Sequence, residues 1–224
     1  MKKTVQLITA ILTTVILSLS LEVIGTTVHA AKTFSKAEAS RPVGYFSNSK
    51  IGVAFHWKSV RTKSGVQSAL IFGDFKAPRL TGGYSLGNQL SKNKRTLTVY
   101  YKKINTKSQL SKTTYHFTLY KLSSRKYQVK VSNQLPSNHG QKYTFYKAKK
   151  SPAKSLANKF SKPVIQKKYK KLLDQQLQKA YQQAKAAGQS VQDPATDPQI
   201  QQREKATIKV ATNSYLKQLV KSFG

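Results

Sequence analysis

Cysteine is absent from the 224 residues of the chain, and acidic residues are scarce. Without cysteine there can be no disulfide, no thiolate zinc ligand, no thiol nucleophile and no lipid-modified cysteine anchor. Only 7 Asp and Glu stand against 40 Lys and Arg, which gives a formal net charge of +33. So few carboxylates leave little material for acid–base pairs or carboxylate-bound metals. We therefore expect neither a cofactor nor a metal, and the positive charge is the feature that points to function.

The first 30 residues predict a signal peptide. Lys2 and Lys3 precede an apolar run over residues 5–21, and Val28 and Ala30 supply the small residues that a signal peptidase reads. Cleavage after Ala30 would leave residues 31–40 as a flexible N-terminus. The alternative is an uncleaved membrane anchor, because the run approaches the roughly 20 residues needed to span a bilayer. The threonines and serines within the run favour the signal peptide.

This leader predicts a secreted protein that is extracellular or associated with the cell wall. No later segment is apolar enough to span a membrane, and the last residues contain no hydrophobic sorting tail. Export without disulfides is unusual in animal secretomes but common in Gram-positive bacteria. The Lys-, Gln- and Asn-rich composition resembles that of small exported proteins of those bacteria. The sequence does not indicate an oligomeric state.

Residues 41–150 predict an antiparallel β-domain in a chain of the α+β class. Short segments alternate apolar and polar residues, as strands with one buried face do, and turn-forming residues separate them. These segments are residues 43–46, 51–57, 66–72, 97–101, 115–119, 127–131 and 143–146. Six or seven strands without an intervening helix predict a meander that forms a small barrel or half-barrel. Residues 44–46, Gly-Tyr-Phe, resemble the glycine–aromatic opening of calycin-like barrels, which implies a small-ligand pocket.

After a linker at residues 151–162, residues 163–224 predict a helical hairpin. Pro163 suits a first helical turn capped by Ser161, and Gly188 suits the end of that helix. Asp197 is the predicted cap of the second helix, with Pro198 at its first position. Each helix carries one apolar stripe, formed by Ile165, Tyr169, Leu172, Leu173, Leu177, Ala180, Tyr181 and Ala184, and by Ile200, Ile208, Ala211, Tyr215, Leu219 and Phe223. Two packings are open: the stripes seal against each other, or the hairpin covers the mouth of the β-domain.

One catalytic motif is matched by the letters of the sequence. Residues 83–87 read Gly-Tyr-Ser-Leu-Gly, the G-x-S-x-G of serine hydrolases, which would make Ser85 the nucleophile. That motif requires an acid and then a histidine downstream, but the downstream histidines precede the next carboxylate, Asp174. We therefore expect a glycine-rich turn here and no enzyme. His56 and His116 lie on the polar side of their predicted strands, where a solvated or hydrogen-bonded side chain is expected.

Lysine dominates the basic residues. Of the 40 basic residues, 34 are lysine and 6 are arginine. Because arginine is preferred for bidentate recognition of phosphate and guanine, this ratio favours diffuse attraction to polyanions over sequence-specific binding of nucleic acid. The residues predicted to bind polyanions are Lys92, Lys94, Arg95, Lys102, Lys103, Lys147, Lys149, Lys150, Lys167, Lys168, Lys170 and Lys171. The candidate aromatic contacts are out of phase with the apolar faces of their strands, and they are Tyr100, Tyr120 and Tyr146.

Four functions are compatible with these features. Export and charge favour a secreted, non-catalytic protein that binds anionic cell-wall polymers such as teichoic acid, or an anionic lipid surface, by diffuse lysine electrostatics. The first alternative is a calycin-like carrier or inhibitor with a small ligand inside the barrel. The second is a membrane-active basic factor that uses residues 163–187 as an amphipathic helix. The last is a hydrolase built on Ser85.

Overall fold

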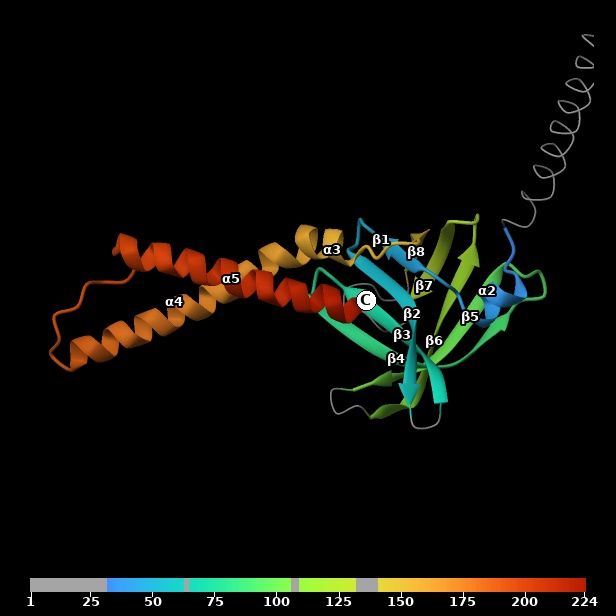
Figure 1. Ribbon diagram of the computed structural model, residues 1–224, viewed down its shortest axis with the longest axis horizontal. Coiled ribbons are helices and arrows are strands. Elements are labelled where there is room, and N and C mark those ends of the chain that lie inside the picture. The colour runs from blue at the N-terminus through green and yellow to red at the C-terminus, as the bar shows by residue number, and fades with distance from the viewer. Residues whose placement is uncertain (1–31, 63–64, 106–108, 132–140) are drawn as a thin grey trace, which may run out of the picture. The chain divides into compact units, whose positions relative to one another are not determined.

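The structure is a computed structural model that describes residues 32–62, 65–105, 109–131 and 141–224. The predicted signal peptide lies outside the described residues. Eight antiparallel strands follow one another in meander order and form a closed barrel (Figure 1). With the C-terminal helices, this confirms the α+β class and the antiparallel meander. The barrel is complete and not a half-barrel.

The strands extend beyond the segments that the sequence predicts. They are β1 (Tyr45–Asn48), β2 (Val53–Thr62), β3 (Gly65–Asp74), β4 (Arg79–Leu90), β5 (Thr96–Ile104), β6 (Leu110–Lys121), β7 (Lys126–Val131) and β8 (Lys142–Ala148). Seven of them overlap the seven predicted segments. The eighth, β4, occupies the region where the G-x-S-x-G residues predict a glycine-rich turn, and that prediction is wrong.

Glycine makes room for an aromatic ring beside β4. A Cβ atom built on Gly83 would lie 2.6 Å from Cδ2 of Tyr101, whose side chain is fully buried. Glycine therefore lets the backbone of β4 approach this ring, as strand glycines often do where the chain packs closely. Gly83 therefore does not form a turn. It is needed for close packing inside a continuous strand.

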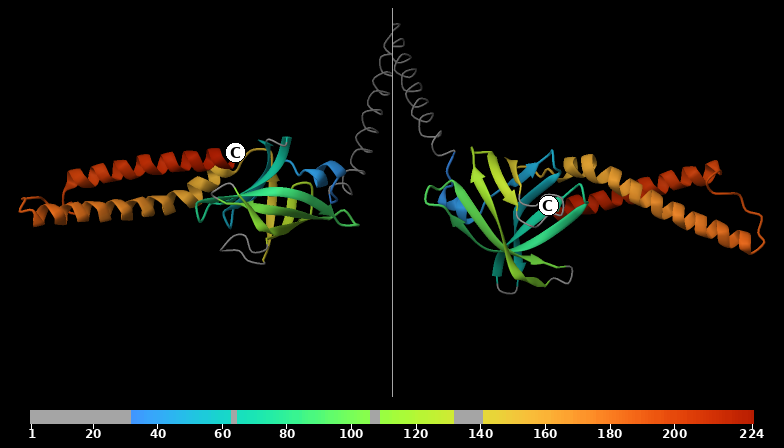
Figure 2. Two further views of the ribbon diagram at one scale, coloured as in Figure 1. Left: turned by 90° about the horizontal axis from the view of Figure 1, so that it is seen from below. Right: turned by 180° about the vertical axis from the view of Figure 1, so that it is seen from behind.

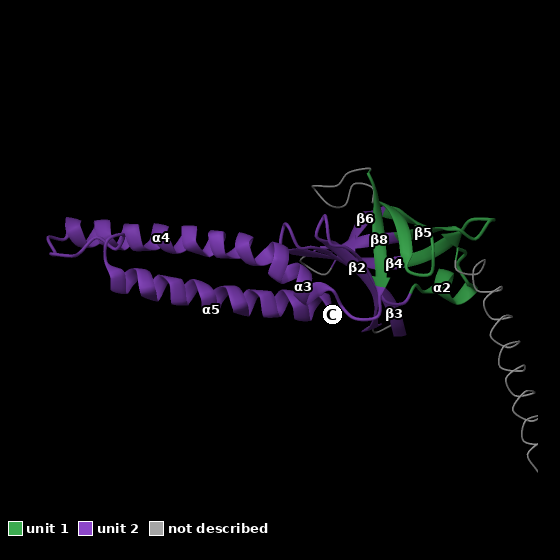
Figure 3. Cartoon of the chain, turned by 90° about the horizontal axis from the view of Figure 1, so that it is seen from above, with its two compact units in different colours: residues 1–42, 86–100, 115–147 green, residues 43–85, 101–114, 148–224 purple. Residues whose placement is uncertain are grey.

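The chain forms two compact units, each made of several segments (Figure 3). Unit 1 consists of residues 1–42, 86–100 and 115–147. Unit 2 consists of residues 43–85, 101–114 and 148–224. The helical hairpin therefore belongs to the same unit as β1, β2 and β3.

Unit 1 has a core of alternate strand residues, each no more than 1% exposed: Leu97, Val99, Phe117, Leu119, Tyr127, Val129 and Phe145. The segment predicted to be a flexible N-terminus contains the short helix α2 (Lys36–Ser40). Ser35 and Glu38 form a capping box, in which each side chain accepts a hydrogen bond from the backbone nitrogen of the other at 3.1 Å. The ring of Phe34 lies 5.9 Å from that of Tyr127, which connects this segment to β7.

Unit 2 buries large side chains on the inward side of its strands. Phe46, Phe55, Phe72 and Tyr101 are each no more than 2% exposed. The rings of Phe46 and Phe55 stack with their centroids 5.1 Å apart. Rings at this separation fill space and gain favourable contact energy, so the inward side of this unit is packed with aromatic side chains.

The predicted linker at residues 151–162 is helical. Helix α3 (Ala153–Leu156) continues through the π-helical turn η1 (Ala157–Ser161) into α4 (Lys162–Ala186). The Ser161 hydroxyl does not cap α4 but donates a hydrogen bond to the carbonyl oxygen of Phe75 at 2.7 Å. Because the helix runs on from η1 into α4, Ser161 lies inside it, and there is no free helix end for its hydroxyl to cap.

The hairpin continues through a short connector into α5 (Pro198–Phe223). Asp197 accepts hydrogen bonds from the backbone nitrogens of Gln199 and Ile200, which confirms the predicted cap. Gly188 has a φ of 74°, the left-handed conformation expected after the end of α4. Figure 2 shows α4 and α5 side by side and antiparallel.

The base of the hairpin packs on the outward side of the strands in unit 2. Phe223, which is fully buried, shares an apolar cluster with Ala54 of β2 and with Phe75. The Tyr215 hydroxyl donates to the carbonyl oxygen of Pro78 at 2.9 Å. His56 of β2 forms a hydrogen bond with the carbonyl oxygen of Phe223. The base of the hairpin is therefore docked on the outward side of these strands.

Candidate functional site

Strands β5, β6, β7 and β8 present a polar face in unit 1, opposite their buried side chains. We call it the sheet face, and it consists of Thr96, Thr98, Tyr100, Thr118, Tyr120, Lys126, Gln128, Lys130, Lys142, Thr144 and Tyr146. The strands β5, β6, β7 and β8 are neighbours in the sheet. Because side chains alternate between the two sides of a strand, these residues all point away from the core of the unit.

Two lysines lie directly opposite each other on this face. Lys130 of β7 pairs with Lys142 of β8, and Lys130 also pairs with Thr118 of β6. Like charges at opposed positions of neighbouring strands destabilise a sheet. A shallow cavity of about 380 Å³ lies over this place, lined by Thr96, Thr118, Tyr120, Gln128, Lys130 and Lys142. The cavity offers two cations, hydroxyls and an amide to any bound group.

Two of the three tyrosines on the sheet face lie beside cations, and the third lies beside a histidine. The guanidinium of Arg95 lies 4.7 Å from the centre of the Tyr120 ring, a cation–π contact that orients the ring. Tyr146 is 56% exposed and is paired across the strands with Lys126. Tyr100 is half-buried and lies 6.0 Å from the ring of His116. The three tyrosines therefore lie on the outward side of their strands, as the alternation of the sequence predicts.

Carboxylates are nearly absent from unit 1. Glu38 is the single acidic side chain in its described part, and it contacts Lys121 at 2.8 Å and Lys147 at 3.8 Å. In the sequence, no carboxylate occurs between Asp74 and Asp174. The lysines of the sheet face therefore have no acidic neighbour on their strands, and their positive potential is not neutralised locally.

The residues predicted to bind polyanions belong to several elements and to both units. Arg95 and Tyr120 are in contact, as described above. Lys92 and Lys94 lie in the turn before β5, where Lys94 has a φ of 56°. Lys102 and Lys103 lie at the end of β5 in unit 2, whereas Lys147 lies in β8 and contacts Glu38. The remaining predicted lysines follow β8 or lie on α4, and they are Lys149, Lys150, Lys167, Lys168, Lys170 and Lys171.

The sequence analysis missed Lys126, Lys130 and Lys142. Lys130 and Lys142 are not contiguous with other basic residues, and Lys126 is adjacent to Arg125 alone, so none of them lies in a longer basic run. A signal was present, since the alternation of β7 and β8 places all three opposite apolar side chains. Their meeting on one face depends on the pairing of β7 with β8, which the sequence alone does not establish.

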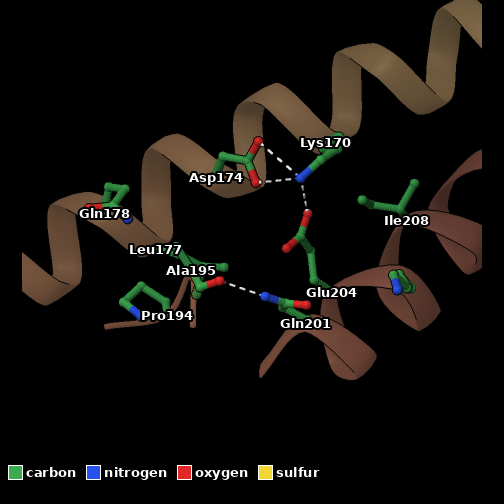
Figure 4. A pocket seen from close by; sticks show the side chains of 10 residues that line it. Lys170, Asp174, Leu177, Gln178, Pro194, Ala195, Gln201, Glu204 and Ile208 are labelled. Carbon is green, nitrogen blue, oxygen red and sulfur yellow. Dashed lines mark hydrogen bonds and ion pairs between the residues drawn. The ribbon is translucent and has the colours of Figure 1, made fainter. Parts of the chain in front are cut away.

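Lys170 is held by two carboxylates in the hairpin. Its ammonium lies 2.9 Å from Asp174 and 3.0 Å from Glu204 (Figure 4). Hydrogen bonds to Asp174 and Glu204 raise the pKa of Lys170 above its usual value. These groups line a cavity of about 540 Å³ together with Leu177, Gln201 and Ile208. Lys170 therefore joins α4 to α5, and its charge is largely matched by these two acids.

Other chemistry-bearing residues are dispersed. Ser85 lies within β4 and lacks the sharp strand-to-helix turn that exposes a hydrolase nucleophile. His116 is exposed, whereas His56 is buried, and that burial lowers its pKa against the opposing effect of its hydrogen bonds to the carbonyls of Phe223 and Trp57. Within the described ranges, no three His, Asp or Glu residues gather in a way that could hold a metal ion.

Among the helices that the structure describes, none combines the length and the apolar character needed to cross a bilayer. Comparison of the chain with models of protein families, with curated proteins and with solved structures finds no match. The functional argument therefore depends on the sheet face and on the charge of the chain.

Proposed function

We propose that this is a secreted, non-catalytic protein that binds anionic polymers of the cell envelope, with the sheet face as a binding surface. The observation that supports this most directly is the opposed pair Lys130 and Lys142 on a unit whose one described carboxylate is already paired. An anion bound between the two ammonium groups would relieve their repulsion. Threonine hydroxyls and the Gln128 amide could donate further hydrogen bonds to its oxygens.

A phosphate-rich polymer suits this surface better than a specific nucleic-acid sequence. Lysine is a mobile point charge that tolerates many geometries, and 34 of the 40 basic residues are lysine. Teichoic acids repeat a phosphate along a flexible chain, so many weak contacts add together. Binding of this kind releases condensed counterions and weakens steeply with salt.

The carrier hypothesis has one supporting observation and one against it. Eight strands in meander order are enough to enclose a small ligand. However, Phe46, Phe55, Phe72 and Tyr101 fill the inward side of unit 2 with rings that are at most 2% exposed. A carrier needs an apolar cavity of several hundred cubic ångströms. We therefore favour a binding surface over a binding pocket.

The membrane-active hypothesis requires α4 to expose its apolar stripe. Ile165 in this stripe is buried, and Leu177 lines the same cavity as Ile208 of α5. Part of the stripe is thus occupied within the fold, although Leu172 is exposed. An interfacial helix would have to separate from α5 to insert, which makes this function less favoured.

The experiment removes the opposed lysines without changing the core. We expect Lys130→Gln/Lys142→Gln to weaken binding to soluble poly(glycerol phosphate) about tenfold. We also expect the slope of log K against log[salt] to become shallower by about one to two, since two phosphate contacts are lost. The matched control Lys32→Gln/Lys36→Gln removes the same charge from exposed positions of unit 1. Equal losses in both variants would show that the sheet face is not a site.

A further inference from the structure

A second cavity lies on the hairpin, next to the cavity that Lys170 lines, and the two share Lys205 and Ile208. It has a volume of about 410 Å³ and is lined by Lys162 and Gln166 of α4 and by Lys205, Ile208, Lys209 and Asn213 of α5. We call it the hairpin cleft. The residues of each helix are mostly spaced by four, the spacing that places side chains on one face. Two rows of polar side chains therefore face a common space.

The charged side chains of the hairpin cleft are all cationic. Lys162, Lys205 and Lys209 line it, and no carboxylate does. The nearest acids in the sequence of the helices, Asp174 and Glu204, line the other cavity and contact Lys170. In the part of the chain that the structure describes, the three ammonium groups of the cleft have no hydrogen bond or ion pair. Three unneutralised cations around one space repel each other and raise its affinity for an anion.

The side chains also match the acceptor geometry of a phosphate group. Each ammonium has three donors, and the amides of Gln166 and Asn213 add two donors each. A phosphate presents several oxygen acceptors around one centre, so donors from both helices can reach it at once. The neighbouring cavity that Lys170 lines offers no such match, because Lys170 is already held by Asp174 and Glu204.

We propose that the hairpin cleft is a binding site for a phosphate group of a phosphate-bearing polymer. For the class of its ligand this inference rests on the proposed function, but it concerns a separate site in unit 2. A chain with one site on the sheet face and another on the hairpin engages a long polymer at two points. The second contact is then intramolecular, and overall affinity exceeds that of either site alone.

The test uses the full secreted chain, inorganic tripolyphosphate and soluble poly(glycerol phosphate). The cleft variant is Lys162→Gln/Lys205→Gln/Lys209→Gln. The matched control is Lys179→Gln/Lys217→Gln/Lys221→Gln, which also removes one lysine from α4 and two from α5, all exposed. Lysine and glutamine have similar helix propensity, so both variants should remain folded, as circular dichroism can verify.

We expect tripolyphosphate to shift the side-chain amide signals of Gln166 and Asn213 in NMR spectra of the unmodified chain and of the control. In the cleft variant these shifts should vanish, and affinity for poly(glycerol phosphate) should fall at least tenfold below that of the control. Shifts that persist in the cleft variant, or equal polymer affinity in the two variants, would overturn the hairpin site and leave the proposed function intact. A chain that binds tripolyphosphate at these amides but not the polymer would support the site and contradict the proposed function.

Discussion

Glu38 is the one acidic side chain described in unit 1, and two lysines converge on it. The side chain of Lys121 is 4% exposed, and its ammonium donates to Glu38 and to the carbonyl oxygen of Thr33, each at 2.8 Å. Burial raises the pKa of Glu38, but the hydrogen bonds from Lys121 and Ser35 and the charges of Lys121 and Lys147 outweigh it. The pKa is therefore lowered from its usual value of 4.5. A buried lysine is tolerated here because a carboxylate meets it.

We predict that Glu38→Gln destabilises the protein by about 1–3 kcal/mol at pH 7, because the buried ammonium of Lys121 loses its counter-charge. The carboxylate binds protons less readily in the folded state, so its contribution is present above about pH 4.5 and is lost as the pH falls through the lowered folded pKa. Urea unfolding at several pH values measures this. The gap between the two proteins should close on acidification, and a gap that is constant with pH would contradict the prediction.

At the scale of elements, periodic sequence patterns predict the strands and helix ends that depend on nearby residues. Alternation locates seven strands, and Gly188 and Asp197 mark the ends of the hairpin helices because caps act over a few residues. Elements that depend on distant contacts were not predicted. Strand β4 lacks apolar residues where the Tyr101 ring takes the space, and the helical turns at residues 153–161 are fixed by packing against unit 2 strands.

Two neighbouring glycines of β4 give a direct test of this explanation. A Cβ on Gly83 would lie 2.6 Å from Tyr101, whereas the nearest atom to one on Gly82 is 3.6 Å away, on Ile104. We predict that Gly83→Ala destabilises the protein by about 1–3 kcal/mol through overpacking. Gly82→Ala should change stability by less than about 0.5 kcal/mol. Urea denaturation compares the two, and equal effects would show that the ring contact does not constrain β4.

At the scale of the whole molecule, the sequence predicts charge but not where the charge gathers. Contiguous lysines such as those at residues 167–171 spread around a helix, since successive side chains differ by about 100°. Lys130 and Lys142 are separated in the sequence and come together only through strand pairing. The phase of Tyr120 and Tyr146 was predicted correctly because it depends on the local alternation of a strand. Export, anionic polymers and the absence of catalysis remain predictions.

The salt dependence of binding to purified cell walls tests the central claim most directly. Walls that retain their phosphate polymers and walls stripped of them are incubated with the chain that lacks the predicted signal peptide, over a range of sodium chloride concentrations. We predict strong retention on intact walls at low salt, a steep linear fall of log K with log[salt], and release in molar salt. Stripped walls should retain little. Binding that persists in molar salt, or that is equal on both kinds of wall, would contradict the account.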